Sequence, residues 1–95
     1  MLFVSLMKAK PESSLEERTK RRLEWDYPEG MRVIGEYWLA GKEPDVIIVS
    51  ECDDALTVIS AIFQWADLFD TTVVPAITGE AGLELARQLQ TSDTV

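Results

Sequence analysis

The fold is decided by residues 46–77, which read VIIVSECDD, then ALTVISAIFQWADLF, then DTTVVPAI. The first segment is an apolar run typical of a buried strand, and it ends at two aspartates. Asp53 or Asp54 is the expected cap of a helix that continues to about Phe69. The last segment again has the composition of a strand, and its Pro75 indicates an edge position or a bulge. The stretch therefore predicts a strand, a helix and a strand in that order.

The sequence before this stretch supplies a second set of elements. Residues 1–7 are apolar and predict a strand that begins at the first residue. Two capping boxes overlap in front of the next helix, one pairing Ser13 with Glu16 and the other pairing Ser14 with Glu17. Either of them starts a helix that runs to about residue 25.

Residues 31–40 predict a further strand, and a short loop at 41–44 joins it to the strand at 46–52. Two strands so close in sequence form an antiparallel hairpin. The complete order is then βαββαβ, which is the ferredoxin-like arrangement with an antiparallel sheet, an α+β fold. We expect one domain over residues 1–78 and a C-terminal helical tail over 79–95.

The strands at 1–7, 46–52 and 72–77 are apolar on both of their faces. Helices in a ferredoxin-like fold cover only one face of the sheet, and the other face usually alternates with polar residues. A second copy of the chain is the simplest cover for the remaining face, because two packed sheets form a symmetric dimer. We therefore expect a homodimer, with the tail helix available for contacts in a higher oligomer.

Composition excludes several functional classes. The net charge is −8 and the chain has no histidine, so a nucleic-acid partner is not expected. No apolar run is long enough for a membrane span and no secretory signal precedes the first strand, so we expect a cytoplasmic protein without a membrane partner. Residues 8–22 are basic, which indicates a solvated helix face or, alternatively, a patch that attracts anions.

No phosphate-binding loop or dinucleotide motif is present, and no cofactor is expected. Asp53 and Asp54 could ligate a metal, but a helix cap is the stronger interpretation at a strand-to-helix junction, so no metal site is expected. Cys52 is the single cysteine and follows an apolar strand. Without a histidine to activate it, we interpret Cys52 as a buried, inert thiol rather than a nucleophile.

The segment Glu51-Cys52-Asp53-Asp54-Ala55-Leu56 resembles a signature of a family of small, uncharacterised prokaryotic proteins in the dimeric α/β barrel superfamily. The first strand, Gly35-Glu36-Tyr37 and the Phe69-Asp70 pair before the Val-Val-Pro strand are similar too. This resemblance covers about residues 1–77. It implies ferredoxin-like protomers that pair into a barrel with a cavity between sheet and helices. Relatives include cofactor-free monooxygenases, isomerases and effector-binding modules, many of which use a histidine that this chain lacks.

Polar residues within the apolar strands are the candidates for a ligand pocket. A period of two places Arg32, Glu36 and Trp38 on one face of their strand. Their phase suggests a cavity walled by apolar side chains, with a glutamate whose raised pKa suits proton transfer. The alternative is a structural ion pair between Arg32 and a glutamate. The full predicted pocket set is Ser5, Arg32, Glu36, Trp38, Glu51 and Thr72, with walls from Phe3, Met7, Ile34, Trp38 and Val49.

Three functions remain open from the sequence. The first is binding of a small molecule in the cavity of a barrel-like dimer. The second is a non-catalytic assembly or sensory module whose core is filled by its own side chains. The third, which the resemblance implies, is a cofactor-free monooxygenase- or isomerase-like enzyme that works without histidine.

Overall fold

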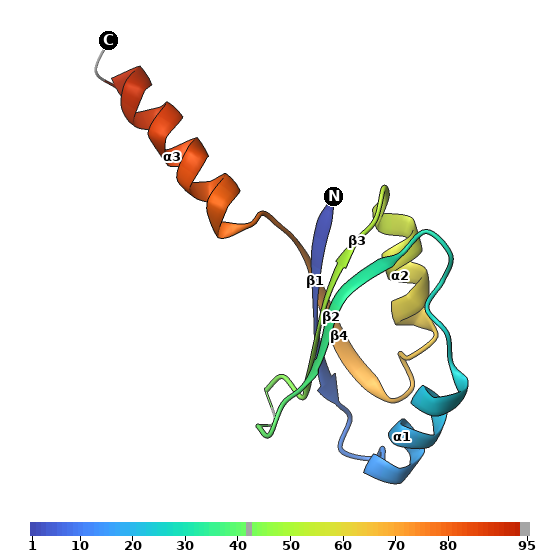
Figure 1. The fold of residues 1–95 in the computed structure, drawn as a ribbon. Helices are drawn as coiled ribbons and strands as arrows, with labels where there is room; N and C mark the ends of the chain where they lie inside the picture. Colours follow the sequence, from blue (N-terminus) through green and yellow to red (C-terminus); the bar gives the residue numbers. More distant parts are fainter. Residues whose placement is uncertain (42, 94–95) are drawn as a thin grey trace.

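The structure is a computed structural model that describes residues 1–41 and 43–93. A four-stranded sheet carries two helices on one side, and a third helix projects away from the sheet (Figure 1). In chain order the elements are β1 (Leu2–Ala9), α1 (Leu15–Glu24), β2 (Arg32–Trp38), β3 (Val46–Glu51), α2 (Ala55–Phe63), β4 (Phe69–Ala76) and α3 (Gly79–Asp93).

The sheet has the strand order β2-β3-β1-β4, and each neighbouring pair is antiparallel. This is the strand order of a ferredoxin-like fold, so the predicted fold class is confirmed. β4 is an edge strand, as Pro75 indicated, because proline cannot donate a hydrogen bond to a further strand. The hairpin of β2 and β3 is also confirmed.

Capping residues set where the two sheet-packed helices begin. Ser14 accepts a hydrogen bond from the backbone N–H of Glu17, and the Glu17 side chain accepts one from the Ser14 N–H, so the second of the two capping boxes is formed. Asp54 caps α2 by accepting the Thr57 N–H at 2.8 Å. Of the two predicted aspartates, Asp54 is the cap and Asp53 is exposed.

The second helix is shorter than the apolar pattern predicted. The helix was expected to continue to about Phe69. Instead α2 ends at Phe63, turns follow, and Phe69 is the first residue of β4. The reason is tertiary packing, since Trp65, Leu68 and Phe69 enter the core from these turns together with Met7. A second buried cluster joins Phe3, Cys52 and Val58.

A β-bulge in β2 overturns the predicted phase of that strand. The register passes from Val33 opposite Ser50 directly to Gly35 opposite Val49, so Ile34 is the extra residue. Arg32 therefore lies on the open face of the sheet, whereas Glu36 lies on the face that α1 and α2 cover. A side chain at Gly35 would collide with the ring of Tyr37, which shows why glycine stands there.

The third helix lies apart from the rest of the chain. α1 and α2 are on one side of the sheet, and α3 points to the other side (Figure 1). The radius of gyration is 16.5 Å, whereas a compact chain of this length has about 12 to 13 Å. In the described part of the chain, no helix combines the length and the apolar character that crossing a membrane requires.

Candidate functional site

A cavity of about 190 Å³ lies between the sheet and the two helices that cover it. Its walls are mainly aliphatic and aromatic, and they come from β1, β2 and β3 below and from α1, α2 and the turns beside them. The lining includes Ser5, Met7, Arg22, Trp25, Tyr27, Glu36, Trp38, Val46, Ile48 and Trp65.

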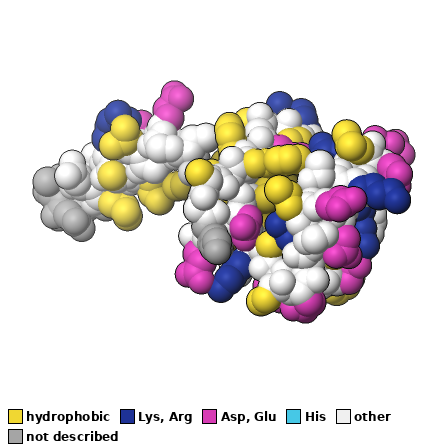
Figure 2. Space-filling view, turned by 90° about the horizontal axis from the view of Figure 1, so that it is seen from below, with side chains coloured by type: hydrophobic (Ala, Val, Ile, Leu, Met, Phe, Trp, Pro, Cys, Tyr) yellow, Lys and Arg dark blue, Asp and Glu magenta, His cyan; other side chains and the backbone are white. Residues whose placement is uncertain are grey.

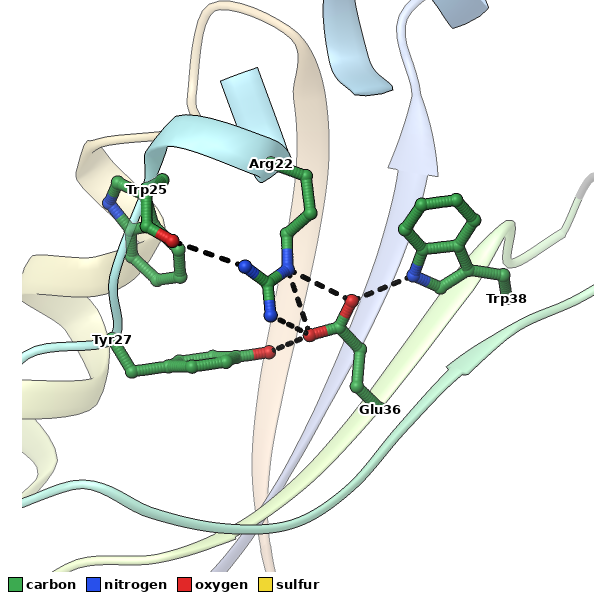
Figure 3. Close-up of polar contacts among 5 residues, drawn as sticks. All are labelled: Arg22, Trp25, Tyr27, Glu36 and Trp38. Carbon is green, nitrogen blue, oxygen red and sulfur yellow. Dashed lines mark hydrogen bonds and ion pairs between the residues drawn. The ribbon is translucent and has the colours of Figure 1, made fainter. Parts of the chain in front are cut away.

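One carboxylate is the polar centre of this cavity wall (Figure 3). Arg22 donates from Nε to both oxygens of Glu36 at 3.1 Å, and from Nη2 to Oε1 at 3.0 Å. Trp38 donates from Nε1 to Oε2 at 2.7 Å, and the Tyr27 hydroxyl donates to Oε1. Both oxygens of Glu36 are thus fully engaged by groups of this chain. We call Arg22, Tyr27, Glu36 and Trp38 the carboxylate cluster.

Three consecutive segments place these four side chains, namely α1, the loop after it that carries Tyr27, and β2. Arg22 is in the last turn of α1, where its cationic side chain favours the negative end of the helix. It also donates from Nη1 to the backbone oxygen of Trp25 at 3.1 Å, which fixes the guanidinium. Glu36 and Trp38 follow the bulge on β2 and point to the same face. The cluster therefore ties α1 to the edge of the sheet.

The titration of the cluster follows from its contacts. Burial alone raises the pKa of Glu36, but the hydrogen bonds from Arg22, Tyr27 and Trp38 outweigh it, so the pKa is lowered overall. Burial, and then the hydrogen bond to Glu36, raise the pKa of Tyr27. Glu36 is thus an anion and Tyr27 a neutral phenol at neutral pH. The predicted glutamate with a raised pKa is wrong for Glu36, because the sequence did not reveal its three donors.

The structure brings together only part of the predicted pocket set. Ser5, Glu36 and Trp38 line the cavity, as does the predicted wall residue Met7. Arg32 and Glu51 instead face the open side, where Arg32 Nη2 lies 2.6 Å from Glu51 Oε2 with the side chains 71% and 49% exposed. The predicted place of Arg32 is wrong because the bulge reverses the phase of β2. That of Glu51 is wrong because β3 turns Ser50 and Ile48, and not Glu51, to the face of Phe3 and Ser5.

Four further predicted residues also lie elsewhere. Thr72 pairs with Leu6 and is exposed on the open face, and Val49 pairs with Val4 on the same face. Ile34 is the extra residue of the bulge and is more than half exposed. Phe3 faces the helices but belongs to the buried cluster with Cys52, away from the cavity lining.

The sequence analysis missed the arginines of α1 as site residues. Arg18, Arg21 and Arg22 place their guanidinium groups over the rings of Phe69, Trp65 and Tyr27, at 5.8, 5.6 and 5.2 Å from the ring centres. Arg21 also pairs with Asp67 at 2.5 Å. The basic run therefore covers aromatic side chains and is not simply a solvated helix face. The available signal was the spacing of the arginines, at three and four residues from Arg18, together with the aromatic residues at 25 and 27. Such a pattern indicates cations that can pack over aromatic rings.

The other two reactive candidates have structural roles. Cys52 is 4% exposed and packs in the core with Phe3 and Val58, which confirms the buried thiol. Asp54 is engaged as the cap of α2. Among the described residues, no group of three or more acidic or cysteine side chains is arranged to hold a metal ion.

Replacing Glu36 with glutamine tests the carboxylate cluster. We expect Glu36→Gln to lower the free energy of unfolding at pH 7 by about 1.5 to 3 kcal/mol, the range for hydrogen bonds to a charged group. Because the folded-state pKa of Glu36 is lowered, its stabilisation is present above its ordinary pKa of 4.5 and is lost as the pH falls through the folded-state value. Urea titrations from pH 7 to 3 should show the difference between the two proteins shrinking in the acid range.

The matched control is Glu43→Gln, since Glu43 forms an exposed ion pair with Lys8 at 2.7 Å. Such an exposed pair contributes little to stability, because water screens the two charges. If Glu36→Gln were no more destabilising than this control, the cluster would not hold α1 to the sheet.

Comparison with known proteins gives a family but no activity. No curated protein and no solved structure matches the chain significantly. A family model described as "Domain of unknown function (DUF3303)" matches residues 1–90, which includes every strand, both sheet-packed helices and most of α3. The chain therefore belongs to the DUF3303 family.

Proposed function

We propose that this chain is a cytoplasmic binding protein for a small, uncharged molecule of about one aromatic ring. The observation that carries the proposal is the cavity of about 190 Å³ with aromatic and aliphatic walls. An apolar cavity of about 150 Å³ is known to stay dry and to accept benzene. A cavity of similar size and lining therefore suits a ligand of that class better than a nucleotide or a sugar.

The polar groups of the cavity indicate which part of the ligand is recognised. Arg22 and Glu36 neutralise one another, so a charged ligand group gains no unpaired counter-ion from that pair. The guanidinium of Arg18, which also lines the cavity, is engaged by two oxygens of Ser13 and by the ring of Phe69. Ser5 lines the cavity from the central strand β1 and is 4% exposed. A hydroxyl or carbonyl on the ligand would satisfy it. The ligand class is then a single ring or short aliphatic chain with one neutral polar group.

Binding is favoured over catalysis by the state of the cluster. Glu36 is saturated with donors and its pKa is lowered, while the pKa of Tyr27 is raised. Neither group exchanges a proton readily near pH 7, which a monooxygenase- or isomerase-like reaction would need from a chain without histidine. The same groups are well suited to hold the cavity wall in one geometry.

The proposal is tested with small neutral probes. Phenol and benzyl alcohol should raise the melting temperature of the purified protein, whereas benzoate, which carries a charge, should have little effect. Ser5→Ala should weaken phenol binding severalfold, because it removes the hydroxyl partner. Ser60→Ala is the control, since Ser60 is exposed on α2.

A cavity-filling substitution separates binding from a purely structural role. Val46 lines the cavity from β3, so Val46→Phe should occupy it and abolish the thermal shift while the protein stays folded. If no probe stabilises the wild-type protein and Val46→Phe only raises its melting temperature, the cavity is a packing defect. The assembly or sensory role would then be the better reading.

We also propose that the functional unit is a homodimer of the dimeric α/β barrel type. The open face of the sheet supports this, because apolar residues of β1, β3 and β4 lie on it with no helix over them (Figure 1). A patch of this extent is unusual on a monomer. The residues concerned are Leu2, Val4, Leu6, Tyr37, Ile47, Val49 and Val74. Sedimentation at micromolar concentration should give the mass of two chains, and a stable monomer would exclude this assembly.

A further inference from the structure

The last helix has one apolar and one polar face. Leu85 and Leu89 lie on one side of α3, are 49% and 58% exposed, and have no other described part of the chain over them; they form the leucine face. Glu80, Glu84 and Arg87 lie on the opposite side of the helix, and Leu83, which is 62% exposed, lies one turn from Arg87. Figure 2 shows apolar side chains gathered along one side of the projecting helix, with the charged ones on another.

An uncovered helix of this length is not expected to be stable by itself. α3 has 15 residues, and isolated helices of about 12 to 15 residues are marginal in water. Within its own chain the helix has few anchors, one of which is the approach of Ile77 to Gly82 at its first turn. Its helical conformation therefore calls for a partner on the leucine face.

The direction of α3 indicates what that partner is. The helix leaves the end of β4 and points to the side of the open sheet face, opposite α1 and α2 (Figure 1). A second chain packed on the open face must therefore lie beside α3. Val74 of β4, Ile77 and the leucines of the helix follow one another along the chain as exposed apolar residues.

The size of the surfaces supports the same partner. Strands about 4.8 Å apart, rising about 3.3 Å per residue, give a four-stranded face a footprint of about 450 Å². A helix of this length and about 10 Å wide adds about 200 Å² of footprint, which is nearly half of what the sheet provides. Standard stable interfaces bury about 800 Å² of accessible surface on each partner, so the added contact favours a stable dimer.

A membrane surface fits the helix less well. Helices that lie on membranes carry Lys and Arg on their polar face. The polar face of α3 has Glu80 and Glu84 against one arginine, and the whole chain has a net charge of −8. Anionic lipid would repel this surface.

We infer that α3 is an exchanged arm, which packs its leucine face on the second copy of the chain within the same dimer. This inference rests on the proposed homodimer. Each protomer then covers the leucines of its partner's α3, while Glu80, Glu84 and Arg87 stay in water. Two-fold symmetry makes both contacts form together.

The direct test uses dimers mixed from isotopically labelled and unlabelled full-length chains. Methyl groups of Leu85 and Leu89 in the labelled chain should show nuclear Overhauser contacts to protons of the unlabelled chain. If the leucine methyl groups contact only protons of their own chain, the exchanged arm is wrong. It is also wrong if no contacts between chains are seen in a protein that sediments as a dimer. A wild-type protein that stays monomeric would overturn both the dimer and the arm, so the two failures are distinguishable.

Substitutions provide the second test. Leu85→Gln with Leu89→Gln should raise the dimer dissociation constant at least tenfold, and should raise hydrogen exchange in α3. The control pair, Glu80→Gln with Glu84→Gln, alters the polar face and should change neither. If the leucine variant instead converted a tetramer to a dimer of unchanged affinity, α3 would join dimers to one another and the inference would be wrong.

Discussion

Trp65→Ala is expected to lower the free energy of unfolding by about 3 to 5 kcal/mol, the usual cost of truncating a buried aromatic residue. Trp65 is 6% exposed and meets the rings of Trp25 and Phe69 edge-on, at centroid distances of 5.6 and 5.8 Å. It also lies under the guanidinium of Arg21. The substitution removes the centre of the cluster that joins α1, the turns after α2 and the sheet. Domains have free energies of unfolding of about 5 to 15 kcal/mol, so the substitution removes a large fraction of the stability.

Urea denaturation followed by circular dichroism measures this loss, at a fixed protein concentration because the proposed association would also contribute to stability. Phe63→Ala is the matched control, since Phe63 ends the same helix but is 75% exposed. The two aromatic truncations should differ by at least about 2 kcal/mol. Equal effects would mean that Trp65 is not the centre of the core.

Val4→Asp is expected to convert the proposed dimer to a monomer. Val4 lies on the open face of the central strand β1, paired with Val49 on one side and Val74 on the other. Two-fold symmetry places a carboxylate from each chain in the same apolar interface, and burial of an unpaired charge there is strongly unfavourable. The dissociation constant should rise at least about a thousandfold, which corresponds to about 4 kcal/mol.

Sedimentation velocity measures the mass, and circular dichroism shows whether the variant remains folded. Leu56→Asp introduces the same charge on α2, at a site that is 76% exposed on the other side of the sheet, and should leave the mass unchanged. Val74→Asp on the edge strand is a second variant, should Val4→Asp fail to fold. A dimer that persists in both would show that the open face is not the interface.

The elements of the fold were predictable because their signals are local. The alternation of Phe3, Ser5 and Met7 gives β1 its buried face, and the structure confirms that face. The capping box at Ser14 likewise marks the start of α1. The end of α2 was not predictable, because Trp65 and Leu68 continue an apolar pattern while the backbone has already left the helix.

The candidate site was only partly predictable for a different reason. A strict period of two identified Glu36 and Trp38, but it placed Arg32 beside them because the bulge adds one residue that the pattern cannot show. The arginine that Glu36 contacts is Arg22, 14 residues earlier on a helix. Which long side chains meet across two elements depends on their packing, and sequence spacing alone does not fix it.

The bulge in β2 has a consequence for how this family tolerates changes in length. Ile34 is the supernumerary residue, so a chain that lacks it keeps Val33 opposite Ser50 and Gly35 opposite Val49 in an uninterrupted ladder. A one-residue deletion at this point leaves Arg32 on the open face and Glu36 in the cavity, whereas deletion of Glu36 removes the carboxylate itself and, when loss of the bulge restores the ladder, turns Gly35 to the covered face. Alignment gaps among relatives should therefore gather at position 34 and spare the four residues that follow.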